Sequence, residues 1–216
     1  MAVAAVFGAR LDSSGVAENE RSPGPAVGKA GAVYVLIAGI LGLAASTALT
    51  VEKIELLIDP SYVPSCSVNP VISCGSVMVT WQASVLGFAN SLIGMVAFTV
   101  TLVTGVLTVG GIRLPRWYWA GLAAGTVLGS VFVHWLIFQS LYRIGALCPY
   151  CMIVWAVTIP LMVVVSSIAL QPLHRNALAR AIYQWRWSFV VLWYTSLALL
   201  VLVRFWEYWS TLLQFS

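Results

Sequence analysis

Charge is what this chain has least of. Asp, Glu, Lys and Arg make up 8% of its 216 residues, whereas hydrophobic residues make up 61%. Soluble domains carry about a quarter charged residues, so this chain lacks the polar side chains that cover a folded surface in water. The composition therefore argues against a soluble fold and favours a lipid bilayer as the surroundings. The net charge of +4 does not indicate a nucleic-acid partner.

Long apolar runs fill most of the sequence. A helix needs roughly 20 apolar residues to cross a bilayer. Five segments meet this length, at approximately 31–51, 87–110, 117–142, 148–170 and 188–206. We therefore predict an all-α membrane protein. Residues 1–30 are instead rich in Gly, Pro, Ser and charge, and are predicted to form a flexible cytoplasmic tail because they cannot offset the entropy cost of ordering.

Basic residues are concentrated on one side of the predicted membrane. Eight of the eleven Lys and Arg lie in the tail and in the 2–3 and 4–5 connections: Arg10, Arg21, Lys29, Arg113, Arg116, Arg175, Arg180 and Arg186. Because such segments stay in the cytoplasm, the N-terminus is predicted to face the inside of a cell (inner) membrane. The loop over 52–86 and the turn before Cys148 then face the exterior, where disulfides form and persist.

The sequence has only four cysteines, and their spacing argues against haem attachment and structural zinc binding. Cys66 and Cys74 lie eight residues apart, and Cys148 and Cys151 form a C-x-x-C pair. A c-type haem needs a histidine directly after that pair, and Met152 stands there. Structural zinc usually takes two closely spaced pairs, and only one is present, so no metal site is predicted. A structural disulfide remains an alternative, although a C-x-x-C bridge closes a very short ring.

Redox-active thiols explain both cysteine pairs better. Cys148 and Cys151 fall in the first turn of the fourth predicted span, with Pro149 at a position that helices accept. The unpaired N–H groups and the dipole of a helix N-terminus favour a thiolate there. The other pair lies in a long loop with several turn residues. A mobile pair beside a fixed pair suits a thiol relay, in which a thiolate attacks a disulfide sulfur.

These motifs, in this order, resemble the vitamin K epoxide reductase family in its bacterial form. The resemblance covers about residues 31–170. Its motifs are Cys66-Ser67-x-Asn69-Pro70-x-x-x-Cys74, Trp81, Asn90-Ser91-x-x-Gly94 and Cys148-x-x-Cys151. It implies a four-helix transmembrane bundle around a quinone pocket over 31–170, with a cytoplasmic loop and a fifth transmembrane helix over 171–216. Many bacterial members continue into a thioredoxin-like domain. This sequence stops at Ser216 without one, so a separate thioredoxin-like exported protein is the expected partner.

The resemblance also implies a reaction. Electrons from the thioredoxin-like partner are expected to enter at Cys66, pass from Cys74 to Cys148, and leave from Cys151 to a membrane quinone of the menaquinone or ubiquinone type. The protein would then be a quinone-dependent thiol oxidase that supports disulfide bond formation in exported proteins. The alternatives are a vitamin K epoxide reductase proper and a non-enzymatic membrane scaffold with structural disulfides.

Two further residues are expected at the quinone. Asn90 matches the family asparagine that hydrogen-bonds a quinone carbonyl. Trp155 lies one helical turn after Cys151 and so faces the same side. The animal enzymes carry tyrosine at that position; tryptophan can stack on a quinone ring, which favours quinone over epoxide as substrate. His134 lies within a predicted span, and a hydrogen bond to a neighbouring helix is expected for it.

Overall fold

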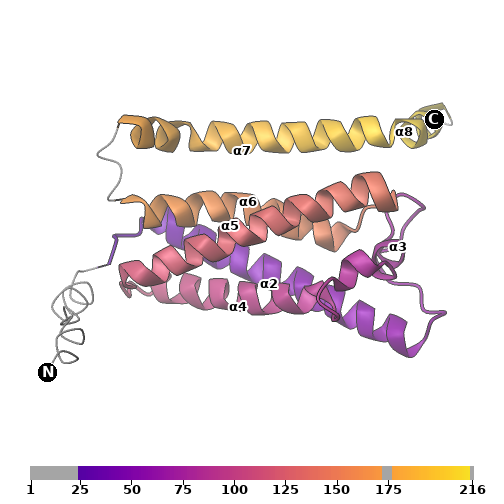
Figure 1. Cartoon of the computed structure of the whole chain (residues 1–216), viewed down its shortest axis with the longest axis horizontal. Coiled ribbons are helices and arrows are strands. Elements are labelled where there is room, and N and C mark those ends of the chain that lie inside the picture. Colours follow the sequence, from indigo (N-terminus) through magenta and orange to yellow (C-terminus); the bar gives the residue numbers. More distant parts are fainter. Residues whose placement is uncertain (1–23, 172–176, 215–216) are drawn as a thin grey trace, which may run out of the picture.

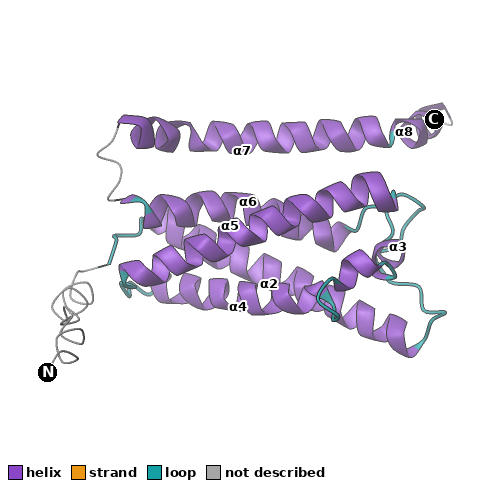
Figure 2. Ribbon diagram, viewed as in Figure 1, coloured by secondary structure: helices purple, strands orange, loops and turns teal. Residues whose placement is uncertain are grey.

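The computed structural model describes residues 24–171 and 177–214, which form helices and no strands. The predicted tail lies largely outside them. The helices, in order, are α2 (Lys29–Ile58), α3 (Cys74–Met78), η1 (Trp81–Ser84), α4 (Asn90–Val109), α5 (Arg116–Gln139), η2 (Ser140–Ile144), α6 (Pro149–Ala169), α7 (Ala177–Arg204) and α8 (Trp206–Gln214) (Figure 2). Five helices are long and apolar enough to cross a membrane, as predicted, and the protein is an all-α membrane protein.

Four of the long helices form a bundle, and the fifth lies alongside it. Helices α2, α4, α5 and α6 run together, with α7 beside α6 (Figure 1). The short helices α3 and α8 lie at one end of the molecule, and the start of α2 lies at the other. The bundle core is apolar and includes Trp119 and Val165, both fully buried.

Glycines bring α2 and α4 into backbone contact. A Cβ built on Gly39 would lie 2.6 Å from the backbone of Leu102, and one built on Gly105 would lie 2.4 Å from that of Leu36. In a bilayer no hydrophobic force drives helices together, so small residues that permit close approach stabilise their packing. Any larger side chain at these two positions would push the helices apart.

Helix α2 is longer than its apolar run predicts. The sequence places the end of the span at residue 51, but the helix continues to Ile58. Its 30 residues correspond to about 45 Å at 1.5 Å per residue, against about 30 Å for a hydrocarbon core. Beyond the bilayer a helix needs no apolar residues, and the added segment, Glu52 to Ile58, consists largely of good helix formers. Two of its charged residues, Glu52 and Lys53, contact the segments on either side of the Cys66–Cys74 disulfide.

The fifth helix is joined to the bundle by hydrogen bonds. The indole nitrogen of Trp193 in α7 donates to Nε2 of His134 over 2.8 Å, and the other ring nitrogen of His134 lies 2.7 Å from the Ser130 carbonyl oxygen. His134 thus contacts its own helix with one ring nitrogen and α7 with the other. Arg204 adds a bond from Nε to the Leu141 carbonyl over 2.8 Å. The expectation of a hydrogen bond between His134 and a neighbouring helix is confirmed.

Candidate redox site

The loop cysteines are joined across a tight turn. Cys66 and Cys74 form a disulfide with their Cα atoms 5.6 Å apart. Between them, the Asn69 side-chain oxygen accepts hydrogen bonds from the N–H groups of Val71, over 3.0 Å, and Ile72, over 2.7 Å. An Asn side chain is one of the few that can close a turn in this way, and Pro70 restricts the backbone next to it. This turn reverses the chain within the nine residues of the motif.

A short backbone bridge then brings this loop to the start of α6. Ile72 pairs with Leu147 as a parallel β-bridge. The Ser73 N–H donates to the Leu147 carbonyl over 2.9 Å, and the Leu147 N–H donates to the Val71 carbonyl over 2.7 Å. Cys74, two residues after Ile72, and Cys148, directly after Leu147, are therefore set side by side.

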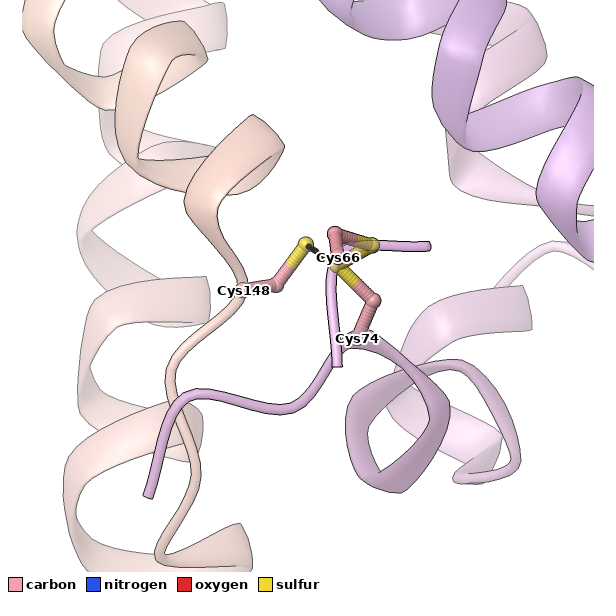
Figure 3. Close-up of side chains that lie close together, drawn as sticks. All are labelled: Cys66, Cys74 and Cys148. Atoms are coloured by element: carbon pink, nitrogen blue, oxygen red, sulfur yellow. Dashed lines mark hydrogen bonds between the residues drawn. A yellow bond between two sulfur atoms is a disulfide. The ribbon is translucent and has the colours of Figure 1, made fainter. Parts of the chain in front are cut away.

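The sulfur atoms of the two cysteine pairs meet at this bridge. Cys148 Sγ lies 3.1 Å from Cys74 Sγ, and its side chain points at the Cys66–Cys74 disulfide (Figure 3). Cys74 and Cys148 are both buried, with 0% and 1% of their surfaces exposed. Thiol–disulfide exchange requires a thiolate at contact distance from a disulfide sulfur. This geometry permits exchange between Cys148 and Cys74 without a large movement of either helix.

Helix α6 favours a thiolate at Cys148. Cys148 is the N-cap residue and Pro149 the first helical residue, as the sequence predicts. The pKa of Cys148 is lowered, chiefly because the Cys151 thiol donates a hydrogen bond to it, with help from the backbone N–H groups of Cys151 and Tyr150. Burial and the charge of Glu52 oppose this shift. A lowered pKa makes Cys148 a thiolate at lower pH than an ordinary cysteine.

The connection from α5 to Cys148 depends on a special backbone conformation. Helix α5 ends in the π-helical turn η2, and Gly145 follows with φ of 72°. Its N–H donates to the Ser140 carbonyl over 2.9 Å, which closes the turn. Glycine adopts this positive φ without steric strain. The chain can then enter the bridge at Leu147.

An apolar cavity lies on the other side of the second cysteine pair. It has a volume of about 560 Å³ and is lined by all four helices of the bundle. Cys148, Cys151, Asn90 and Trp155 all contribute to its wall. Cavities that hold drug-sized ligands are largely apolar and measure roughly 300–1,000 Å³. A quinone ring with part of its apolar tail matches this cavity in size and in polarity.

The sequence matches the family model of the vitamin K epoxide reductase family over residues 33–166. The chain belongs to the vitamin K epoxide reductase family. The matched range contains the four bundle helices and both cysteine pairs, and it ends before α7. A comparison with curated proteins finds no match. Membership associates the protein with quinone-linked redox chemistry and identifies it as an oxidoreductase.

Asn90, predicted as a quinone ligand in this family member, also organises the backbone around it. Its side-chain oxygen accepts from the Val85 N–H over 3.1 Å, and its amide nitrogen donates to the Gln82 carbonyl over 2.7 Å. An amide nitrogen has two hydrogens. Beyond this bond to Gln82, the Asn90 amide therefore has a second N–H to donate at the cavity wall.

Trp155 and the glycines of α5 shape the cavity. Trp155 is 2% exposed and lines the same cavity as Cys151, which lies one turn earlier in α6. Gly121, Gly125 and Gly129 also line it, and a Cβ built on any of them meets nothing within 4 Å. These glycines leave space for a ligand, whereas those of α2 and α4 bring backbones together.

Three polar residues near the cysteines were not predicted from the sequence: Glu52, Lys53 and Gln82. Lys53 and Gln82 line the cavity. The Gln82 side-chain oxygen is buried without a hydrogen-bond partner among the described residues. Their signal in the sequence is weak, because charged and amide residues near either end of a span are normal in any membrane protein.

Three sulfur atoms at the site are also close enough for a metal ion. Cys66, Cys74 and Cys148 have their Sγ atoms within 4.8 Å of one another. Zinc binds thiolates, and two of these sulfurs are joined in a disulfide. In this redox state, Cys148 is the only one of the three that can act as a thiolate ligand.

Proposed function

We propose that this protein oxidises the thiols of a separate thioredoxin-like exported protein and delivers the electrons to a membrane quinone, which supports disulfide formation in exported proteins. One observation carries the proposal: the 3.1 Å contact between Cys74 and Cys148, with Cys148 and Cys151 on the wall of the apolar cavity. The contact connects the two pairs, and the cavity gives the second pair access to a lipid-soluble acceptor.

The first stage transfers electrons from the partner to the loop pair. A partner thiolate attacks Cys66, the Cys66–Cys74 bond breaks, and Cys74 leaves as a thiolate. The second partner thiol then displaces Cys66, so the partner leaves as a disulfide and both loop cysteines are reduced. Cys66 is the better target because 7% of its surface is exposed, against 0% for Cys74.

The second stage passes the electrons to the helix pair. Cys74 attacks Cys148 of the Cys148–Cys151 disulfide, and Cys151 leaves as a thiolate. Cys66 then attacks Cys74, which restores the loop disulfide and frees Cys148. The structure corresponds to this product state, with Cys66–Cys74 closed and Cys148 and Cys151 free. A quinone in the cavity supplies a two-electron acceptor, and Cys148 and Cys151 reclose as they give up two electrons and two protons.

The test is quinone reduction by the purified protein with a reduced thioredoxin-like dithiol protein as donor. Turnover is expected with a soluble benzoquinone or naphthoquinone analogue, and its loss is expected when either cysteine pair is replaced by alanine. Absence of turnover with every such donor, while the protein is folded and its thiols are intact, would contradict the proposal.

The rival functions give different outcomes in related assays. An epoxide reductase proper would convert vitamin K epoxide with the same donor at least as fast as it reduces quinone; Trp155 in place of tyrosine favours quinone. A scaffold with structural disulfides would show no exchange of either pair with mild reductant in differential thiol labelling. Zinc that protects the thiols from alkylation until a chelator is added would support a metal site instead.

A further inference from the structure

Glu52 is a buried carboxylate in the last two turns of α2, the helix that leads into the cysteine loop. It is 8% exposed. Its Oε2 accepts hydrogen bonds from the Tyr62 hydroxyl over 3.0 Å and from the Ser65 N–H over 3.2 Å, and its Oε1 accepts from the Ser65 hydroxyl. All three donors are uncharged and lie in the segment just before Cys66. Burying a carboxylate is costly unless it is well hydrogen-bonded, so these contacts keep Glu52 in place.

The next residue of α2 holds the other side of the disulfide. Lys53 donates from Nζ to the Met78 carbonyl over 2.6 Å, at the end of the short helix α3 that begins with Cys74. Two adjacent residues of one rigid helix therefore hold the two flanks of the loop disulfide. Glu52 holds the residue before Cys66, and Lys53 holds the helix that contains Cys74.

The two flanks differ in how else they are held. Cys74 is also fixed by the backbone bridge to Leu147 and by the serine cap of α3. Among the described residues, the other hydrogen bonds of the stretch from Asp59 to Tyr62 are local, such as Tyr62 N–H to the Asp59 carbonyl and Ser61 to the Asp59 carboxylate. The Asp59 N–H also donates to the Glu55 carbonyl of α2, and after Cys66 the Ser67 hydroxyl oxygen accepts from the Gly75 N–H. Glu52 is thus the side chain that joins the residues just before Cys66 to α2.

We propose that Glu52 is a positioning residue, which holds Cys66 against Cys74 and so sets how readily the loop disulfide opens. Holding one thiol beside its partner raises their effective concentration and favours the closed disulfide. In the relay, which rests on the proposed function, the same contact keeps reduced Cys66 within reach of Cys74. Cys66 can then attack Cys74 in a Cys74–Cys148 bridge, so that this bond breaks and Cys148 leaves as a thiolate.

The test is the redox equilibrium of each pair, measured without quinone or partner. Purified wild-type and Glu52→Gln proteins are equilibrated over a series of glutathione ratios, quenched in acid, alkylated and mapped by mass spectrometry. We expect Glu52→Gln to shift the Cys66–Cys74 equilibrium toward the dithiol about tenfold, or about 30 mV for a two-electron couple. The Cys148–Cys151 equilibrium should change less than about threefold, because Glu52 makes no hydrogen bond to that pair and its charge is the smallest of the influences on the pKa of Cys148.

Two further variants separate positioning from general loosening. Tyr62→Phe removes one donor and leaves Glu52 in place, so it should shift the loop equilibrium in the same direction by a smaller factor. Glu55→Gln is the matched control, since Glu55 is an exposed carboxylate one turn further along α2 and should shift neither pair. Equal shifts of both pairs in Glu52→Gln, or no shift of the loop pair, would overturn the inference.

This outcome is distinguishable from that of the proposed function. If the loop equilibrium responds to Glu52 but the wild type never reduces quinone, the positioning role stands and the relay to quinone fails. If the wild type reduces quinone and the loop equilibrium ignores Glu52, only the positioning role fails.

Discussion

The two cysteine pairs are built in opposite ways. The loop pair lies in irregular backbone and is held by side chains. Asn69 closes the turn between the two cysteines, Glu52 binds Ser65 just before Cys66, and Lys53 binds the end of α3, which begins with Cys74. The helix pair needs no such contacts, because the first turn of α6 fixes both residues. A pair held by several separable hydrogen bonds can open to admit a protein partner, whereas a pair within a helix keeps its position beside the cavity.

The difference also gives the expected direction of electron flow. A stabilised thiolate favours the reduced form of a pair and makes its disulfide the stronger oxidant. The pKa of Cys148 is lowered at the helix N-terminus, mainly by the Cys151 thiol. The loop pair, held closed, favours its disulfide. Electrons are therefore expected to pass from the loop pair to the helix pair, and four changes test this contrast.

The largest effect is expected from Cys151→Ala, which removes the thiol that recloses the helix pair. Quinone reduction should fall to background. The Cys148 thiolate can then only attack Cys74 of the loop disulfide and release Cys66 as a thiolate, because the Cys74 and Cys148 sulfurs are 3.1 Å apart and Cys148 has no other partner in its own helix. A fraction of the molecules should therefore carry a Cys74–Cys148 bridge with Cys66 free or joined to the donor protein. Disulfide mapping after alkylation in intact cells measures this. Absence of the Cys74–Cys148 bridge in all molecules, at every concentration of the donor protein, would contradict the relay and favour structural disulfides.

Filling the cavity should separate quinone reduction from thiol exchange. Gly125→Leu places a branched side chain where a Cβ now meets nothing within 4 Å on the cavity wall. We expect quinone use to weaken by roughly a hundredfold, or about 2.8 kcal/mol at 1.4 kcal/mol per factor of ten. Exchange between the cysteine pairs should be unchanged.

The control for this change is Val127→Leu, on the same helix at a position that is 44% exposed and does not line the cavity. It should leave quinone reduction and exchange as they are. If Gly125→Leu and Val127→Leu lower turnover equally, the cavity is not where the acceptor binds.

Asn90→Ala should have a mixed effect of moderate size. Loss of the amide removes the proposed bond to a quinone carbonyl and also strands the Val85 N–H and the Gln82 carbonyl. A stranded group costs about 1–3 kcal/mol when buried, so the melting temperature should fall. Turnover per folded molecule should fall by a further one to two orders of magnitude (about 1.4 kcal/mol each). Normal turnover per folded molecule would make Asn90 purely structural.

Some parts of this molecule were predictable because their causes act locally. Hydropathy locates the five spans, and Pro149 marks the start of α6 because proline fits the first helical turn. Other parts depend on contacts that leave no periodic signal. The single pairing of Ile72 with Leu147 is one residue long, yet it sets Cys74 beside Cys148.

The glycines are the clearest example of features whose role cannot be predicted from the sequence. Small residues recur along both the first and third predicted spans and look alike in the sequence. In the structure Gly39 touches the α4 backbone, whereas Gly125 faces open space in the cavity. The residue type indicates that something approaches closely, and the neighbouring helix decides whether that is backbone or ligand. Likewise, Glu52 cannot be distinguished from an ordinary interfacial charge until Ser65 is placed beside it.

The smallest expected effect concerns the pH at which Cys148 reacts. Cys151→Ala and Cys151→Ser both lack the reclosing thiol, so both should form the Cys74–Cys148 bridge. A serine hydroxyl can still donate a hydrogen bond to the Cys148 thiolate, whereas alanine cannot. Because this bond is the main cause of the lowered pKa of Cys148, the pKa should be lower in the serine variant. Burial and the charge of Glu52 act equally in both.

The sign of the effect follows from the thiolate as the attacking species. Below the pKa the bridge forms more slowly as pH falls, and above it the rate is constant. The serine variant should therefore keep its rate to lower pH, and at pH 7 it should form the bridge several-fold faster. Rapid acid quenching after a pH jump, followed by disulfide mapping, gives both profiles. Coincident profiles would show that the helix N-terminus, rather than the neighbouring thiol, favours the Cys148 thiolate. The difference between the two cysteine pairs would then arise from the backbone alone.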